Sequence, residues 1–376
     1  MDLAAFDYDL PEQAIAQTPI EPRDRARLLV DRGRDEEPDH RSVADLPTLL
    51  GPGDVLVLNT TRVLPARLKL HKPTGGAVEV LLLERQPEGH WDALVKPSRR
   101  VPPGTVLHAG DDLDVELRGE GTGEGTRQVV LHLHGRGERH RAAAVGTDAD
   151  RWPPQPTGSD EARQIDELAV LARHGVVPLP PYITAPLADP ERYQTVYADR
   201  SESVAAPTAG LHLTPTLLDA CRAAGAEIVT VELAVGLGTF RPMTADKVED
   251  HEMHAERYRV PTATLEACRA ADRVVAVGTT AVRALESAAQ TGRLEGRTEL
   301  FIRRPYDWQL VDVLLTNFHL PRSSLLVLVD AFVGARWRDL YALALDDGYR
   351  FLSFGDAMLL ARGTDPADPA DPGAPA

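Results

Sequence analysis

The sequence predicts an α/β protein in which a large α/β domain carries an inserted small all-β domain of barrel-like form. In the outer parts of the chain, apolar runs of strand length, such as 55–58 and 274–277, alternate with amphipathic helical patterns. Several of these runs end in small or polar residues, where α/β proteins place their binding sites. From 68 to 150 the helical patterns give way to short β-like runs.

This change from helical patterns to short β-like runs divides the chain into two domains. We assign residues 1–67 and 151–362 to the large α/β domain and residues 68–150 to the insert. Within the insert, β-like runs are separated by turns rich in glycine, proline and charge, a pattern typical of a barrel or sandwich. The tail 363–376 consists mainly of proline, alanine and aspartate, a composition typical of disordered segments.

The first polar strand end follows the apolar run 55–58. Asn59-Thr60-Thr61-Arg62 stands there, and Arg67 and Lys69 come soon after. This cluster suits a ligand anion or an RNA phosphate. A solvated, charged strand edge is the simpler alternative, and residue types alone favour it.

The segment 203–214 consists mostly of small, neutral residues and leads into a helix start. Thr214 suits an N-cap, Pro215 suits the first helical position, and the strand 227–235 follows. Small side chains let a ligand approach the backbone, and the helix start offers free N–H donors. His212 is the polar side chain within the segment, and a packed turn that satisfies it internally is an equal alternative.

Two further motifs follow the strand 227–235. Gly236-Leu237-Gly238-Thr239-Phe240 contains a lone Gly-x-Gly, which is weak evidence for a dinucleotide. The run 250–256 is dense in acidic residues and histidine but lacks the His-Glu-x-x-His spacing of zinc peptidases. Acid–base or substrate-binding roles are therefore favoured over a metal site, with a solvated acidic segment as the alternative.

The C-terminal part repeats the strand-then-polar design. The apolar run 274–277 leads through Gly278-Thr279-Thr280 into a helix, which predicts a cradle for an anion or polar ligand, and Arg283 adds a fork for a carboxylate. The run 313–315 ends in Thr316-Asn317-Phe318-His319, and 351–358, which includes Asp356, completes the core.

Composition sets further bounds. The chain has 376 residues, a formal net charge of −16 and two cysteines without metal-like spacing. The charge argues against indiscriminate nucleic-acid binding but allows a local basic patch. An acidic N-terminus, reduced cysteines and the absence of a long apolar run predict a cytoplasmic protein without a membrane segment.

Taken in order, the motifs resemble one known family over nearly the whole chain. They are Phe6-Asp7-Tyr8-Asp9-Leu10-Pro11, Pro22-Arg23, Gly53 to Asn59, Thr61-Arg62-Val63, Pro178 to Ile183, Arg192 to Ala198, Ser203 to His212, Gly236-x-Gly238-Thr239-Phe240, His251 to Glu256, Val277 to Thr280, Thr316 to Pro321 and Gly355 to Met358. This set resembles the S-adenosylmethionine:tRNA ribosyltransferase-isomerase family of queuosine synthesis.

The resemblance implies a large α/β domain with an inserted β-barrel. It also implies transfer and isomerisation of the ribosyl part of S-adenosylmethionine onto 7-aminomethyl-7-deazaguanine at a tRNA wobble position, which gives epoxyqueuosine, adenine and methionine. S-adenosylmethionine would be a co-substrate, with no tightly bound cofactor and no metal, because its sulfonium already acidifies the adjacent methylene. The expected partner is tRNA with a deazaguanine wobble base, bound by a monomer.

Motif membership and residue chemistry then predict the site. His212 or His254 is expected to carry the proton, with Glu256 and Asp356 as orienting carboxylates. Residues expected to hold the co-substrate are Thr208, Gly210, Gly236, Gly238, Thr239, Gly278, Thr279, Thr280 and Arg283. Residues expected to line the substrate pocket are Arg62, Asn317 and His319.

The chain also departs from the family pattern at Thr60, Glu202, Leu213, Ala234 and Asp330, where the family usually has Asp, Gly, Phe, His and a small Ser-like residue. These departures leave two alternatives beside the tRNA enzyme. One is the same chemistry on a free small-molecule acceptor, and the other is a non-catalytic RNA-binding relative.

Overall fold

The computed structural model describes residues 1–33, 36–123, 125–134, 160–236 and 242–363. Gly238, Thr239 and the expected tail from 364 onward lie outside these residues. The chain forms two compact units, which are described separately: Met1–Arg62 with Leu179–Ala376, and Val63–Pro178.

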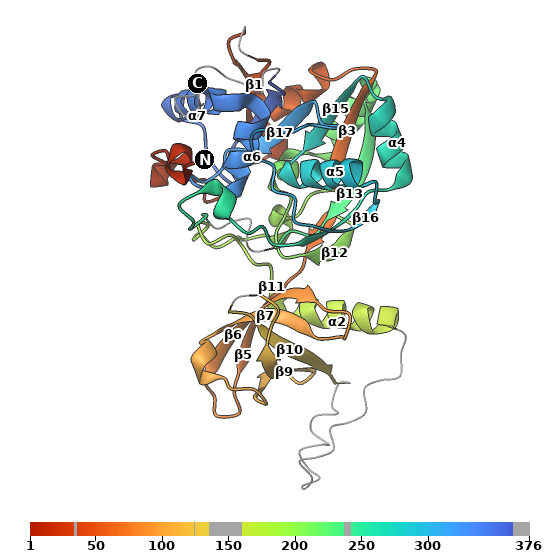
Figure 1. The fold of residues 1–376 in the computed structure, drawn as a ribbon. Coiled ribbons are helices and arrows are strands. Elements are labelled where there is room, and N and C mark those ends of the chain that lie inside the picture. Colours follow the sequence, from red (N-terminus) through yellow and green to blue (C-terminus); the bar gives the residue numbers. More distant parts are fainter. Residues whose placement is uncertain (34–35, 124, 135–159, 237–241, 364–376) are drawn as a thin grey trace. The chain divides into compact units, whose positions relative to one another are not determined.

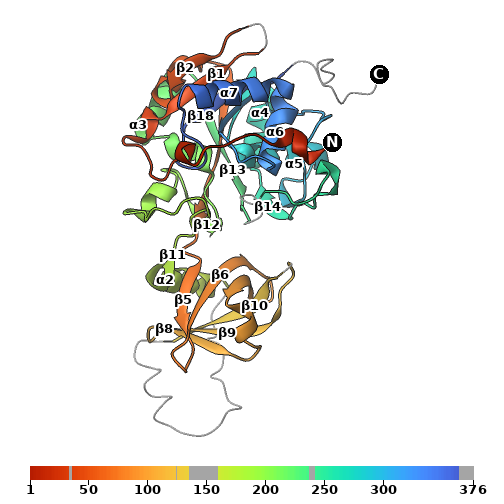
Figure 2. The same cartoon turned by 90° about the vertical axis from the view of Figure 1, so that its left-hand side faces the viewer.

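The first unit is built on a mixed sheet (Figures 1 and 2). In spatial order its strands are β16 (Glu295–Thr298), β14 (Glu256–Arg259), β13 (Glu227–Leu233), β3 (Asp54–Asn59), β15 (Arg273–Val277), β17 (Val313–Asn317), β18 (Ala357–Ala361), β1 (Arg27–Asp31) and β2 (Asp39–Ser42). Strands β13, β3, β15 and β17 are parallel. Strand β18 is antiparallel to β17 and parallel to β1.

Apolar cores lie on both faces of this sheet. On one face, α4 (Thr262–Ala270), α5 (Thr279–Thr291), α6 (Ser324–Val333) and α7 (Trp337–Asp346) contribute to a buried cluster with strand residues such as Val57 and Ala276. On the other, α3 (Pro215–Ala223), η4 (Val43–Thr48) and η7 (Thr208–His212) pack with Leu56 and Val275. Alternate residues of β3 and β15 therefore point to opposite faces and pack into different cores, as in other sheets covered on both faces.

Local signals explain the two helix starts nearest the site. The Thr214 hydroxyl accepts a hydrogen bond from the Leu217 backbone N–H at 3.1 Å, and Pro215 opens α3, as predicted. Before α5, Gly278 adopts φ +89°, a conformation that side chains rarely tolerate, and turns the chain from β15 into the helix. The predicted strand–glycine–helix unit is therefore present.

The second unit is a small antiparallel barrel. Its sheet order is β11 (Gly175–Val176), β5 (Arg67–His71), β6 (Ala77–Arg85), β7 (Trp91–Lys96), β10 (Arg127–Leu133), β9 (Leu113–Glu120) and β8 (Val106–Ala109). Strands β5 and β8 also pair, with His71 opposite His108, which closes the sheet. The predicted fold class, an α/β domain with an inserted barrel-like domain, is confirmed.

Helix α2 (Asp160–His174) belongs to this barrel unit. Val170 and Leu171 are buried, and the His174 imidazole bonds to the Asp112 carboxylate at 2.5 Å. Strand β11 then pairs with β5. The sequence prediction assigned residues from 151 onward to the large domain, because a helical pattern alone does not indicate the barrel surface on which the helix packs.

The remaining elements are short. They are β4 (Thr61–Val63), which pairs with β12 (Arg200–Ser203), and the turns η1 (Leu3–Phe6), η2 (Glu12–Ala14), η3 (Arg23–Arg25), η5 (Ser98–Arg100), η6 (Pro190–Tyr193), η9 (Val248–Asp250) and η10 (Gly334–Arg336). Cys221 and Cys268 are buried free thiols. Among the described residues, no helix has the length and apolarity needed to cross a bilayer.

Candidate active site

Four chain segments meet at one edge of the large sheet. Asn59 ends β3, Gly278 follows β15 and Asn317 ends β17, and these strands are parallel. Ala357 lies opposite Asn317 in the antiparallel pair, so Asp356 reaches the same edge. The carboxyl edge of a parallel sheet is where α/β proteins bind ligands.

Asn317 connects two of the predicted site residues. Its side-chain Nδ2 donates to Nε2 of His212 at 3.2 Å, and its Oδ1 accepts from the Thr208 hydroxyl at 2.9 Å. Nδ2 also lies 3.4 Å from the Asp356 carbonyl oxygen. The structure therefore brings Thr208, His212 and Asn317 together, although His212 and Asn317 are 105 positions apart in sequence.

His212 is a neutral imidazole in this setting. Burial lowers its pKa to about 3, with a smaller effect from the charges of Arg350, Arg192 and Arg23. Because Nε2 accepts a hydrogen bond from the Asn317 amide, the proton of the neutral ring resides on Nδ1.

His319 is also held neutral. Burial lowers its pKa to about 3, and its Nε2 bonds to the Thr316 hydroxyl at 2.9 Å. Its backbone is fixed by two tyrosines: the N–H donates to the Tyr341 hydroxyl at 3.0 Å, and the Tyr8 hydroxyl donates to the carbonyl at 2.5 Å. The side chain is thus firmly positioned at the end of β17.

The Asp356 carboxylate binds backbone groups. One oxygen accepts from the Arg27 N–H at 2.9 Å and the other from the Arg350 N–H at 2.8 Å. Its connection to His212 runs through its own carbonyl and Asn317. Asp356 therefore shapes the loop behind the histidine rather than contacting the imidazole.

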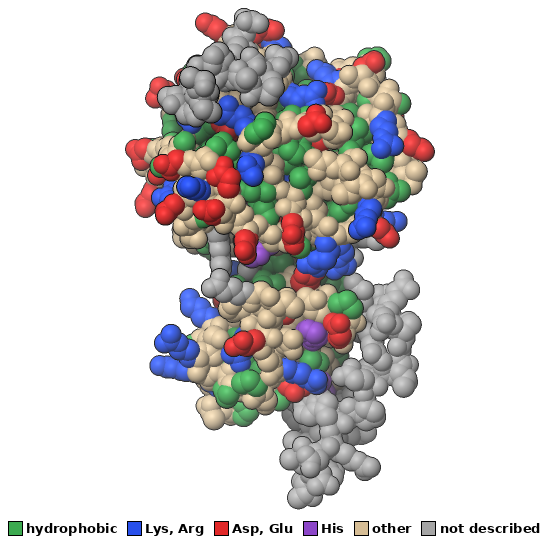
Figure 3. Space-filling view, in the orientation of Figure 1, with side chains coloured by type: hydrophobic (Ala, Val, Ile, Leu, Met, Phe, Trp, Pro, Cys, Tyr) green, Lys and Arg blue, Asp and Glu red, His purple; other side chains and the backbone are tan. Residues whose placement is uncertain are grey.

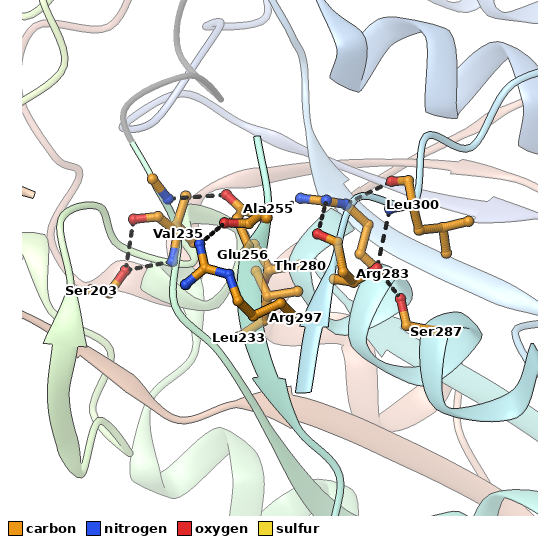
Figure 4. Close-up of polar contacts among 12 residues, drawn as sticks. Ser203, Leu233, Val235, Ala255, Glu256, Thr280, Arg283, Ser287, Arg297 and Leu300 are labelled. Carbon is orange, nitrogen blue, oxygen red and sulfur yellow. Dashed lines mark hydrogen bonds and ion pairs between the residues drawn. The ribbon is translucent and has the colours of Figure 1, made fainter. Parts of the chain in front are cut away.

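Glu256 and Arg283 form a buried ion pair (Figure 4). Glu256 Oε1 also accepts from the Gly236 N–H at 3.0 Å, while Arg283 Nε donates to the Leu300 carbonyl at 3.1 Å. The Arg283 guanidinium, expected from sequence to bind a cofactor carboxylate, therefore already has a counter-ion in Glu256.

A small cavity of about 20 Å³ lies at the N-terminus of α5 beside this pair. Thr279 and Thr280, with Glu256 and Arg283, form part of its lining, and apolar side chains such as Phe301 complete it. The cavity therefore has a polar and an apolar side, and the cradle expected at this helix start stays a prediction.

Two other predicted residues are more exposed. His254 is exposed, whereas its neighbour His251 is half-buried against Phe301, with ring centroids 5.6 Å apart. Burial, together with the His254 charge, lowers the pKa of His251. Arg62 pairs with Glu191 at 2.5 Å on β4, outside the large sheet.

Asn59 belongs to the polar cluster predicted after the run 55–58, but the sequence analysis assigned it no individual role. Its buried Nδ2 donates to the Leu233 carbonyl at 3.1 Å and to the Thr280 hydroxyl at 3.0 Å. Its Oδ1 accepts from the Leu233 N–H at 3.1 Å. Asn59 thereby fixes the start of α5 against β13, and the available signal was an amide directly after four apolar residues.

Replacing Gly210 with Ala is expected to lower the free energy of unfolding by about 1–3 kcal/mol, the usual effect of overpacking. A Cβ there would lie 1.9 Å from the Tyr197 hydroxyl and 3.0 Å from Thr195 Cγ2. Urea denaturation of the Gly210→Ala variant measures the loss.

Tyr197→Phe is the matched control for this clash. Among the described residues the Tyr197 hydroxyl has no hydrogen-bond partner, so Tyr197→Phe alone should be nearly neutral. In the Gly210→Ala background it should recover part of the stability. Equal stability of the double and single variants would rule out the clash with the hydroxyl.

Comparison with known proteins identifies the family. A model described as "Queuosine biosynthesis protein" matches residues 3–360. The chain belongs to this family. A relative from Thermus thermophilus, named S-adenosylmethionine:tRNA ribosyltransferase-isomerase, is 48% identical over 369 residues, covering 95% of this chain and 99% of the relative.

Two further comparisons support the family assignment. A relative of the same name from Rubrobacter xylanophilus is 47% identical, covering 95% of this chain and 97% of its own. A crystal structure titled S-adenosylmethionine tRNA ribosyltransferase, from Thermotoga maritima, is 34% identical with a TM-score of 0.50. The match covers 95% of this chain and 99% of the Thermotoga maritima chain.

One departure from the family pattern is explained by its surroundings. Asp330 is fully buried in α6, where Arg304 binds both its oxygens at 2.7 and 3.0 Å and the Trp337 indole N–H donates to it at 3.0 Å. Burial raises the pKa of Asp330, and Arg304 offsets part of the cost of the buried carboxylate. The buried hydrogen bonds from Arg304 and Trp337 thus accommodate this departure from the family pattern.

Proposed function

We propose that this chain is an S-adenosylmethionine:tRNA ribosyltransferase-isomerase. It transfers and isomerises the ribosyl part of S-adenosylmethionine onto 7-aminomethyl-7-deazaguanine in the tRNA wobble position, and releases adenine and methionine. The observation that carries the proposal is the family match over residues 3–360, together with 48% identity to a relative of that name along almost its whole length. The names of the relatives favour tRNA over a free small acceptor.

The reaction needs a proton taken from the methylene beside the sulfonium and a hydrogen-bond partner for a leaving group. A general base works best when its pKa lies near the operating pH. With a pKa of about 3, His212 suits a neutral hydrogen-bonding role better than proton abstraction. We therefore assign His212 to positioning through its Nδ1–H. His254, the other histidine that motif membership indicates, is proposed as the proton carrier.

The start of α5 offers contacts for one polar group of the co-substrate, although the cavity of about 20 Å³ is too small to enclose the whole molecule. Thr279 and Thr280 sit in the first turn of the helix, where N–H groups favour an anionic or polar group such as a carboxylate. The apolar lining that includes Phe301 suits an uncharged portion of the ligand. The Glu256–Arg283 pair forms part of the cavity lining, and we do not assign it to binding the carboxylate of the co-substrate.

The test is turnover with S-adenosylmethionine and tRNA that carries 7-aminomethyl-7-deazaguanine. Adenine release and the mass of the modified nucleoside are followed together. Adenine release coupled to an epoxyqueuosine mass supports the proposal. Adenine release only with the free deazaguanine base, or S-adenosylmethionine binding without turnover on this tRNA, contradicts it.

Replacing His212 with Ala is expected to lower kcat by about 10²-fold or more, the scale of a lost positioned hydrogen-bonding group in an active site. His212→Gln, which keeps a neutral hydrogen-bonding side chain, should retain more activity than His212→Ala. Because a group with a pKa of about 3 does not titrate near neutrality, the pH–rate profile between pH 6 and 9 should keep its shape in His212→Gln.

The companion variant is His254→Gln, which should change the shape of that profile because it removes the proposed proton carrier. Circular dichroism confirms that each variant is folded. Near-normal turnover by His212→Ala would overturn the assignment of His212, and an unchanged profile in His254→Gln would overturn that of His254.

A further inference from the structure

The outer face of barrel strands β5, β6 and β7 carries lysines that the site described above does not use. Lys69 on β5 lies opposite Glu79 on β6, and Glu79 lies opposite Lys96 on β7. Directly paired residues of antiparallel strands point to the same face, and neighbouring strands lie about 5 Å apart. Lys69 and Lys96 are therefore about 10 Å apart across one face. Both are exposed.

Three more cations extend this surface. Strand β7 leads directly to the turn η5, where Arg99 and Arg100 are exposed. The Lys72 ammonium donates to the carbonyl of Arg100, which places Lys72 beside the same turn. We call Lys69, Lys72, Lys96, Arg99 and Arg100 the basic face. Figure 3 shows Lys and Arg side chains gathered along one edge of the barrel unit.

Direct ion pairs do not offset the charge of the basic face among the described residues. Glu79, the acid between the two lysines, is paired with Arg67 at 3.0 Å. Among the residues that the structure describes, none of the five cations of the basic face lies within ion-pair distance of a carboxylate. Four exposed arginines of the other unit, Arg32, Arg41, Arg222 and Arg259, each pair with a carboxylate.

An uncompensated cluster of this kind is notable in a chain with a formal net charge of −16. Lys and Arg side chains spaced along a surface are the groups that bind the phosphates of a nucleic acid. Such contacts fix the position of the bound strand without reading its sequence, so they complement a separate site that recognises the modified base.

We propose that the basic face binds the phosphodiester backbone of the RNA substrate. The proposal rests on the proposed function, which supplies a tRNA as that substrate. The basic face supplies affinity and orientation, and the reaction takes place at the edge of the large sheet.

The test compares two fourfold variants with the wild type. In one, Lys69, Lys96, Arg99 and Arg100 of the basic face are each replaced by Gln. In the other, Arg32, Arg41, Arg222 and Arg259 are each replaced by Gln, which changes the net charge equally. Fluorescence anisotropy with labelled tRNA between 50 and 200 mM salt gives Kd and its salt dependence, and circular dichroism checks folding.

Each lost phosphate contact lowers the slope of log K against log salt by about 0.7–0.9. The basic-face variant should therefore bind tRNA more weakly, with a slope reduced by about 3. Over this salt range, wild-type affinity should fall roughly 60-fold further than that of the basic-face variant. The control variant should keep the wild-type slope.

An unchanged slope in the basic-face variant, or an equal reduction in the control, overturns the inference. Failure of the proposed function has a different signature: the wild type itself would bind but not convert tRNA, or would not bind it at all. Wild-type turnover together with wild-type RNA affinity in the basic-face variant overturns this inference alone.

Discussion

Replacing Arg283 with Met is expected to reduce the free energy of unfolding by about 3–5 kcal/mol, because it removes the arginine that pairs with the buried Glu256 carboxylate. Glu256 and Arg283 are both almost fully enclosed, and Leu300 and Thr298 carbonyls also lose a donor. Urea denaturation followed by circular dichroism measures the change.

The double variant Glu256→Gln/Arg283→Met removes both charges and should recover much of this loss. Arg222→Met is the matched surface control, since its pair with Asp219 is solvent-exposed and should contribute no more than about 1 kcal/mol. A loss for Arg283→Met as small as that for Arg222→Met would contradict the buried-pair argument.

Lowering the pH from 7 to 5 is expected to reduce the free energy of unfolding by about 4 kcal/mol through His212 and His319 together. Both have a native pKa of about 3, below the ordinary value of 6.5. Between these values the unfolded chain binds more protons than the native protein. Stability present above pH 6.5 is therefore lost as the pH falls, by about 2 kcal/mol for each histidine at pH 5.

Urea denaturation at pH 7, 6 and 5 tests this dependence on pH. The variants His212→Gln and His319→Gln should each show a shallower fall than the wild type by about 2 kcal/mol at pH 5. His254→Gln applies the same substitution at an exposed position and so controls for the change of residue itself. Equal losses of stability in the wild type and the two buried-site variants would show that His212 and His319 do not cause the dependence on pH.

Features encoded by neighbouring residues were predictable from the sequence. Thr214 and Pro215 specify the start of α3 within a few positions, and the apolar run before Gly278 specifies β15 and its turn into α5. The loss of helical pattern after residue 68 likewise revealed the barrel, because closely spaced turns and short alternating runs favour antiparallel strands.

Pairings between distant positions were not predictable. Arg283 appeared available for a ligand, because Glu256 lies 27 positions earlier and reaches it only when β14 joins the sheet. Asp356 looked like an orienting carboxylate for a histidine, yet its oxygens are taken by N–H groups of Arg27 and Arg350. Sequence reveals which groups stand at strand ends, whereas side-chain partners depend on the tertiary fold.

The position of β18 has a consequence for how the protein is made. This strand, Ala357–Ala361, lies between β17 and β1, and so joins the first strand of the chain to the rest of the sheet. During synthesis, β1 and β2 must wait for nearly the whole polypeptide to emerge before their neighbour exists. A nascent chain halted before residue 357 leaves the open edges of β1 and β17 exposed, and such edges invite aggregation. Among the described strands, β18 is thus the last to leave the ribosome, and it pairs with the strand that carries Asn317.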